Sequence, residues 1–206
     1  MDRRILRFLT SFLLFAATIC IIGANADAAE PVIDAEKTTA ATLNSGPGLG
    51  EYVPTFYSRA VTGPLMNKSI CYVCRNGQRP VVAVFVRSFE PKLKSLLQNI
   101  DRVVDRNRVI GLRSFTVKLG DDPFSDISAV QTFSFNNKIA MPFTVASEAV
   151  AVPSCQNIHS NAAVTVVFYR KRRVEKTFVF RKGELTTDEV RTVIQGVKDF
   201  AGESAK

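Results

Sequence analysis

The sequence contains few of the residues that most often carry chemistry. It has one histidine, His159, and four cysteines in 206 residues. No serine or cysteine nucleophile motif surrounds His159, so it is interpreted as a solvated loop histidine rather than a general base. No glycine-rich phosphate loop and no nucleic-acid-binding motif is present. We therefore expect no cofactor and no nucleic-acid partner.

Long apolar runs are equally scarce, and only one approaches the length of a membrane span. It covers residues 8–22, follows three arginines, and is followed by two small-residue A-x-A sites that end at Ala26 and Ala28. A basic start, an apolar middle and an A-x-A exit are typical of a secretory signal peptide, here residues 1–28. The sequence thus predicts an exported protein, periplasmic or secreted. A retained anchor is the alternative, and only then would the protein contact a membrane.

The rest of the chain has the composition of one ordinary globular domain. Hydrophobic residues make up 46% and charged residues 22% of the sequence, and the formal net charge is +8. Residues 29–51 are mostly small and polar, which predicts a flexible leader before a domain at residues 52–202. The one basic cluster, residues 170–173, lies between two strand-like runs and is expected to form a solvated hairpin tip.

The pattern of apolar residues predicts a mixed α/β domain. A continuous apolar run at residues 81–87 is typical of a strand covered on both faces. Pro91 then opens a one-face apolar pattern that fades near Asn107, as expected of an amphipathic helix. The other expected elements are strands at 53–61, 114–119 and 143–145, an ambiguous segment at 124–137, a hairpin of 163–169 with 174–180, and a helix from the capping box of Thr186 and Glu189 to about residue 200.

This order of elements, with a Cys-Tyr-x-Cys at residues 71–74 before a Pro-Val-Val strand, resembles the thioredoxin-like superfamily. It is most similar to exported bacterial peroxiredoxin-like and thioredoxin-like proteins, over about residues 81–200. The resemblance implies a thioredoxin-like fold of the α/β class: a central mixed sheet with a parallel βαβ unit, an antiparallel hairpin and a closing helix. It also implies a thiol or disulfide substrate, or a protein partner that the sequence does not name.

The position of the cysteine pair departs from the family pattern. In working members the Cys-x-x-Cys follows the first core strand and opens the next helix, whose N-terminus stabilises a thiolate. The matching place here, residues 88–91, has no cysteine and contains Glu90. Members also place a cis-proline before the hairpin, where this chain has Ala162-Ala163 in a peroxiredoxin-like alignment. A plain thioredoxin alignment puts Met141-Pro142 there instead, but the hairpin then lies too far downstream. These departures favour a structural disulfide between Cys71 and Cys74 over a catalytic one. The expected function is therefore that of an exported, non-catalytic envelope module.

Two other interpretations of the pair stay open. Arg75 and Arg79 flank it and would lower a cysteine pKa by their charge, so an envelope thiol–disulfide oxidoreductase is the alternative function. In that case Cys71 is the expected nucleophile and Cys74 the resolving cysteine. A zinc site would need Cys71 and Cys74 together with Cys155 and His159, but the two halves lie eighty residues apart and export favours oxidation. We therefore expect no metal.

Overall fold

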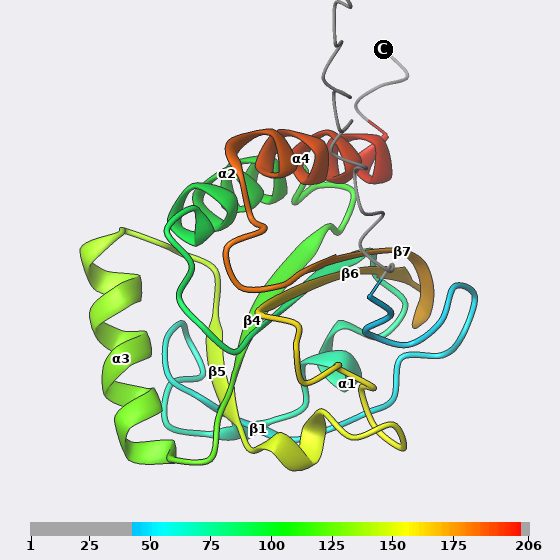
Figure 1. Ribbon diagram of the computed structural model, residues 1–206. Coiled ribbons are helices and arrows are strands. Elements are labelled where there is room, and N and C mark those ends of the chain that lie inside the picture. Colours follow the sequence, from blue (N-terminus) through cyan, green and yellow to red (C-terminus); the bar gives the residue numbers. More distant parts are fainter. Residues whose placement is uncertain (1–42, 203–206) are drawn as a thin grey trace, which may run out of the picture. The chain divides into compact units, whose positions relative to one another are not determined.

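The described chain is built around strand β3 (Val81–Val86), whose six residues are all buried. The computed structural model describes residues 43–202 (Figure 1), so the predicted signal peptide and most of the predicted leader lie outside the described residues. Side chains alternate along β3. Those of Val82, Val84 and Val86 enter one apolar cluster, and those of the odd-numbered residues enter a second. The prediction of a strand covered on both faces is therefore confirmed.

Seven strands form one mixed sheet in the order β2-β1-β5-β4-β3-β6-β7. Strand β3 pairs in parallel with β4, and β4 in parallel with β5. Strand β3 also pairs antiparallel with β6, which forms an antiparallel hairpin with β7. The other strands are β1 (Ser58–Ala60), β2 (Ser69–Ile70), β4 (Arg113–Leu119), β5 (Phe143–Ala146), β6 (Val164–Arg170) and β7 (Arg173–Phe180). The predicted parallel βαβ unit and the hairpin are both present.

Helices α2 (Leu93–Arg106) and α4 (Thr187–Ala201) lie together on one side of the sheet (Figure 1). Their buried side chains complete the first apolar cluster with β3 and β6. Helix α2 buries six apolar side chains, and each contributes roughly 1.5–3 kcal/mol of burial free energy. The second cluster, on the opposite face, is covered by α1 (Tyr72–Asn76) and by irregular chain. A short 3-10 helix, η1 (Glu148–Val150), follows β5.

Two helix starts depend on side-chain caps. The Thr186 hydroxyl accepts a hydrogen bond from the backbone N–H of Glu189, so the predicted start of α4 is confirmed. The ambiguous segment at 124–137 is also a helix, α3 (Pro123–Asn136). Its start is fixed by the Asp122 carboxylate, which accepts from the backbone N–H groups of Phe124 and Ser125. The sequence leaves this helix ambiguous because its serines and asparagines weaken the apolar pattern.

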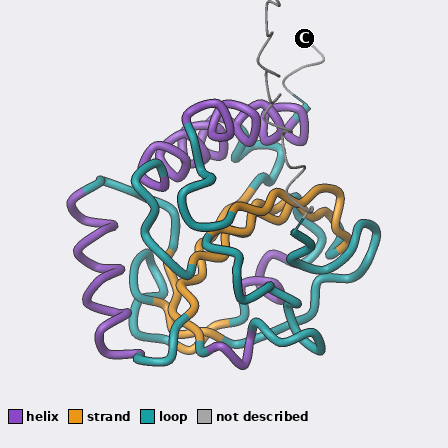
Figure 2. The backbone as a smooth tube through the Cα atoms, viewed as in Figure 1, coloured by secondary structure: helices purple, strands orange, loops and turns teal. Residues whose placement is uncertain are grey.

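The last part of the predicted flexible leader packs against the sheet. Before β1 this segment is loop apart from a bridge of Tyr52 with Arg173 (Figure 2). The Ser45 hydroxyl hydrogen-bonds the Thr165 hydroxyl at 2.8 Å, and the backbone N–H of Gly46 donates to Asn157 at 2.8 Å. Gly46 has a φ of +92°, in the region that favours glycine. Small residues therefore let the backbone of this segment lie close to the sheet. This packing differs from the flexible leader expected for residues 29–51.

The basic hairpin tip is packed rather than wholly solvated. Lys171 and Arg172 both have positive φ, as a tight two-residue hairpin turn requires. The Arg173 guanidinium lies 4.0 Å from the centre of the Tyr52 ring and donates to the Gly50 carbonyl. Arg172 donates to the carbonyl of Val53. The expectation of a purely solvated tip was therefore incomplete: these arginines hold the segment that precedes β1.

Candidate functional site

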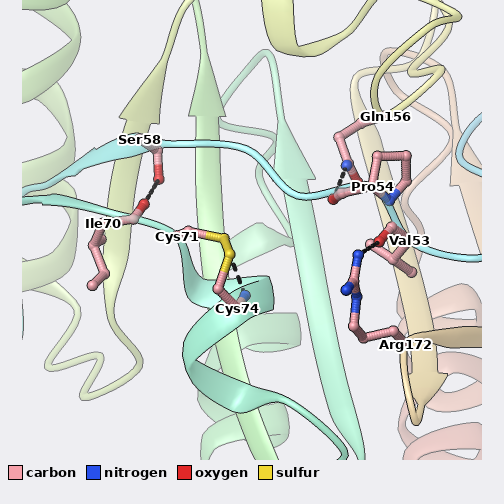
Figure 3. Close-up of a disulfide and its surroundings, with 8 residues drawn as sticks. All are labelled: Val53, Pro54, Ser58, Ile70, Cys71, Cys74, Gln156 and Arg172. Carbon is pink, nitrogen blue, oxygen red and sulfur yellow. Dashed lines mark hydrogen bonds between the residues drawn. A yellow bond between two sulfur atoms is a disulfide. The ribbon is translucent and has the colours of Figure 1, made fainter.

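Cys71 and Cys74 form a disulfide at the start of helix α1 (Figure 3). Cys71 is the N-cap residue, and its sulfur accepts a hydrogen bond from the backbone N–H of Cys74 at 3.0 Å. The helix ends at Gly77, which has positive φ and returns its N–H to the Val73 carbonyl. The close pair thus bridges as the sequence predicts. The pair does open a helix, but one of only five residues.

The two cysteines differ in exposure. Cys71 is 3% exposed and lies in the second apolar cluster with Val53 and Phe56, whereas Cys74 is exposed. An external thiol therefore has access to Cys74 rather than to Cys71. The sequence-based roles, with Cys71 as nucleophile and Cys74 as resolving cysteine, would need the opposite order of exposure in the oxidised protein.

The disulfide and the position expected of a reactive pair lie at opposite ends of β3. The disulfide precedes Val81, while residues 87–91 follow Val86. At the second end an ion pair occupies the space, because Arg87 Nη2 lies 2.6 Å from Glu148 Oε2. The same guanidinium donates to the loop carbonyls of Ile158 and His159.

Glu90 closes the same end of the sheet from the helix side. It is 6% exposed, and its carboxylate accepts from the Ser88 hydroxyl at 2.7 Å and from the Gly183 N–H at 2.9 Å. Helix α2 starts at Leu93 without a side-chain cap. A buried carboxylate near this helix start disfavours a second anion, so no thiolate site is built here.

The remaining sequence-predicted candidates are not brought together. His159 is exposed, and its Nδ1 accepts from the N–H of Asn161. Cys155 is a free, half-buried thiol that packs against the second cluster. Cys71 and Cys74 are bonded to each other, and no group of three metal-ligating side chains occurs within residues 43–202. The structure therefore does not assemble the zinc site considered from the sequence.

Two features of the backbone bear on the family resemblance. Residues 43–202 contain no cis peptide bond, so Pro142 is trans and Ala162-Ala163 occupies the place expected of the cis-proline. Among the same residues no helix combines the length and apolarity that would carry it across a bilayer.

A basic cavity, which no motif in the sequence indicates, lies beside α1. It has a volume of about 310 Å³ and lies where β4 begins. We call it the arginine pocket. Its polar and charged lining residues are Tyr72, Arg75, Asn76, Arg79, Asp101, Arg108, Arg113 and Ser114.

Burial shifts the pKa values of two charged groups in the arginine pocket. Burial lowers the pKa of Arg113, and the neighbouring charges of Arg79 and Arg108 lower it further. Burial raises the pKa of the Asp101 carboxyl, although it accepts the backbone N–H groups of Met141 and Ala140. Only Arg75 and Arg79 had drawn attention in the sequence, because they flank the cysteines. The other two arginines join them through tertiary structure, which no local motif signals.

Comparison with known proteins places the fold. No protein-family model matches the chain, and no curated protein matches it. Several solved structures are similar to it. A candidate protein disulfide isomerase from Bacteroides thetaiotaomicron is 13% identical, with a TM-score of 0.57 over 78% of this chain and 95% of that one. A DsbF homologue from Corynebacterium diphtheriae is 14% identical, with a TM-score of 0.55 over 77% and 96%. The reduced 2-Cys peroxiredoxin of Plasmodium vivax is 15% identical, with a TM-score of 0.54 over 74% and 83%. These similarities, at low identity, confirm the thioredoxin-like fold.

Proposed function

We propose that this chain is an exported module with a thioredoxin-like fold that binds a partner and does not catalyse thiol–disulfide exchange. One observation carries the proposal. The end of β3 where a reactive pair is expected holds the Arg87–Glu148 ion pair and buried Glu90, while the only disulfide among the described residues lies at the other end. The fold supplies the scaffold, but this scaffold lacks a thiol at the helix start that would activate it.

In this account the disulfide between Cys71 and Cys74 is a local staple. It ties the N-cap of α1 to the next turn and keeps the buried Cys71, Tyr72 and Val73 packed under the sheet. Closing so short a loop contributes about 2 kcal/mol by the chain-entropy model. That contribution needs no special electrostatic surroundings, which fits the apolar cluster around Cys71.

A second candidate is an envelope thiol–disulfide oxidoreductase. The observation in its favour is the exposed Cys74, with Arg75 beside it. In that reaction a thiolate of a reduced partner attacks the Cys74 sulfur, the bond to Cys71 breaks, and its electron pair leaves with Cys71 as a thiolate that takes up a proton. A second partner thiolate then attacks the partner sulfur of the mixed disulfide. The partner leaves as a disulfide, and Cys74 is released reduced. Exposure favours this order over the sequence-based one, in which Cys71 attacks.

The reduction potential of the pair separates the two candidates. We expect equilibration with glutathione buffers to give a potential below about −300 mV, as is typical of structural disulfides. The reduced fraction is read by mass spectrometry after alkylation, in a Cys155→Ser background so that only the pair contributes. A potential in the range of oxidoreductases, about −120 to −270 mV, would favour the second candidate.

Export is a separate part of the proposal. We expect N-terminal sequencing of the protein recovered from outside the cytoplasm to show cleavage after Ala26 or Ala28. The mature chain would then begin at Asp27 or Ala29. An intact N-terminus held in the membrane fraction would support the anchor instead.

A further inference from the structure

We propose that the arginine pocket is a binding site for a small phosphate-bearing ligand. Arg75 lies on α1, Arg79 in the turn before β3, Arg108 after α2, and Arg113 at the start of β4. Four arginines and one aspartate line the pocket of about 310 Å³, and Asp105 pairs with Arg108 from outside the lining, which leaves two formal positive charges. Cavities that hold small ligands begin at about this volume.

Three of the four arginines, Arg75, Arg79 and Arg113, have no carboxylate partner within the described part of the chain. In residues 43–202 the side chains of Arg75 and Arg79 have neither a hydrogen bond nor an ion pair. The Arg113 guanidinium donates only to the carbonyls of Leu112 and Arg108. Like charges gathered this way repel, and the lowered pKa of Arg113 reflects part of that repulsion. An anion in the pocket would relieve it.

The acidic residues nearby pair with only one of the four arginines, Arg108. Asp101 uses one carboxylate oxygen to accept the backbone N–H groups of Ala140, at 2.8 Å, and Met141, at 3.1 Å. It therefore caps the turn that leads to β5. Asp105 lies 2.7 Å from Arg108 in an exposed ion pair, which contributes little to stability.

A neutral donor also lacks a partner. The Tyr72 hydroxyl is buried and makes no hydrogen bond in the described structure, although Tyr72 lines the pocket and is 6% exposed. An unpaired buried hydroxyl costs about 1–3 kcal/mol. Burial raises the pKa of Tyr72, so the group keeps its proton at neutral pH and is available as a donor. Ser114 adds a second hydroxyl to the lining.

Phosphate is the anion that fits this set of donors. A guanidinium pairs with two oxygens of a phosphate in a fork geometry, and several guanidiniums can share one phosphate. A single carboxylate would offset only one of the two excess charges. The ligand is thus a compound with one or two phosphate groups, either free in solution or at the head of a lipid.

Titration calorimetry with sodium pyrophosphate, at about 0.15 M NaCl to screen distant charges, tests the site. We expect one pyrophosphate per chain. The variant Arg75→Gln/Arg79→Gln should weaken binding at least about tenfold, because two charge-assisted contacts are lost. Lys92→Gln/Lys94→Gln removes two exposed charges near the start of α2 and is the matched control. It should change binding by less than about twofold.

The outcomes are decisive in both directions. No binding at millimolar pyrophosphate, or equal weakening in the two double variants, would overturn the proposal. Displacement of pyrophosphate by phosphatidylcholine vesicles that contain phosphatidic acid, but not by phosphatidylcholine alone, would identify a lipid headgroup as the source. Displacement only by soluble phosphate esters would identify a free compound. The phosphate site rests on the proposed binding role, but the two proposals can fail separately. Catalytic thiol–disulfide exchange at Cys74 would overturn the non-catalytic role and leave pyrophosphate binding intact.

Discussion

Cys71 and Cys74 are three residues apart, yet only Cys74 is exposed. After mild reduction we expect iodoacetamide to alkylate Cys74 at least about tenfold faster than Cys71, because access limits the reaction at the buried sulfur. Timed alkylation with peptide mass spectrometry measures both rates in one sample. Faster labelling at Cys71 would contradict the exposure order and restore the sequence-based role of Cys71 as the attacking group.

Removing the disulfide should lower stability by a small amount. We expect Cys71→Ser/Cys74→Ser to lose about 2 kcal/mol of unfolding free energy, because a four-residue loop is no longer closed in the unfolded chain. For a domain of this size that corresponds to a fall in Tm of about 4–8 °C. Cys155→Ser, which breaks no bond, is the control. An unchanged Tm in the double variant would show that the disulfide does not act as a staple.

Asp101 should make stability depend on pH. Burial raises the pKa of its carboxyl above the value in the unfolded chain, about 3.9. The folded state therefore holds this proton more tightly, and wild-type stability falls as pH rises through the interval between the two pKa values. Asp101→Asn removes that loss and can still accept the backbone N–H groups.

Urea unfolding across a pH series checks this prediction. The stability difference between Asp101→Asn and wild type should grow in favour of the variant from about pH 3 to about pH 7. Asp105→Asn, four residues along the same helix and exposed, is the matched control for removing a carboxylate from α2. A difference for Asp101→Asn that shrinks with rising pH would contradict the burial argument.

At the scale of elements, β4 and α3 meet at a buried ion pair. Lys118 Nζ lies 2.8 Å from Asp126 Oδ1, and both side chains are largely buried. A Cβ added to Gly120 would lie 1.9 Å from Asp126 Oδ2, so Gly120→Ala must displace the carboxylate. We expect this substitution to cost about 1–3 kcal/mol. Thermal or urea unfolding measures the loss.

A double-mutant cycle shows whether the clash is the cause. Asp126→Ala alone should cost about 3–5 kcal/mol, since it leaves Lys118 buried without its partner. In that background the carboxylate is gone, and adding Gly120→Ala should cost less than about 1 kcal/mol. An equal cost of Gly120→Ala in both backgrounds would place the strain elsewhere.

The elements that the sequence predicted well carry their signal locally. Strand β3 is a continuous apolar run, α2 has a one-face stripe, and the start of α4 has a side-chain cap. Strands β1 and β2 span three and two residues and exist through pairing with each other and with β5, so a predicted strand at 53–61 was too long. Their boundaries depend on partners distant in sequence, which a local pattern does not contain.

At the scale of the whole domain, the candidate site was predicted only in part. The bridge between Cys71 and Cys74 follows from their spacing and the expected export, and its place before β3 follows from the apolar run. The arginine pocket does not follow from the sequence. Arg79 and Arg113 meet because β3 and β4 begin side by side in a parallel pair, with Val81 opposite Arg113. Spacing along the chain carries no trace of that pairing.

The two ends of β3 hold different sets of side chains. One end is filled by Arg87, Glu148 and Glu90, whose contacts hold the loop after η1 and the chain before α4. The other end carries the disulfide on α1 and, beside it, the arginine pocket. The proposed binding role would use the positive charge at the second end.

Insulin reduction by glutathione, followed with catalytic amounts of the purified protein, shows whether the Cys71–Cys74 pair turns over. We expect wild type and Cys71→Ser/Cys74→Ser to give the same rate, equal to that of glutathione alone, because the buried sulfur and the filled end of β3 provide no activated thiol. Turnover by wild type that disappears in the variant would contradict this expectation and establish the pair as a working redox centre.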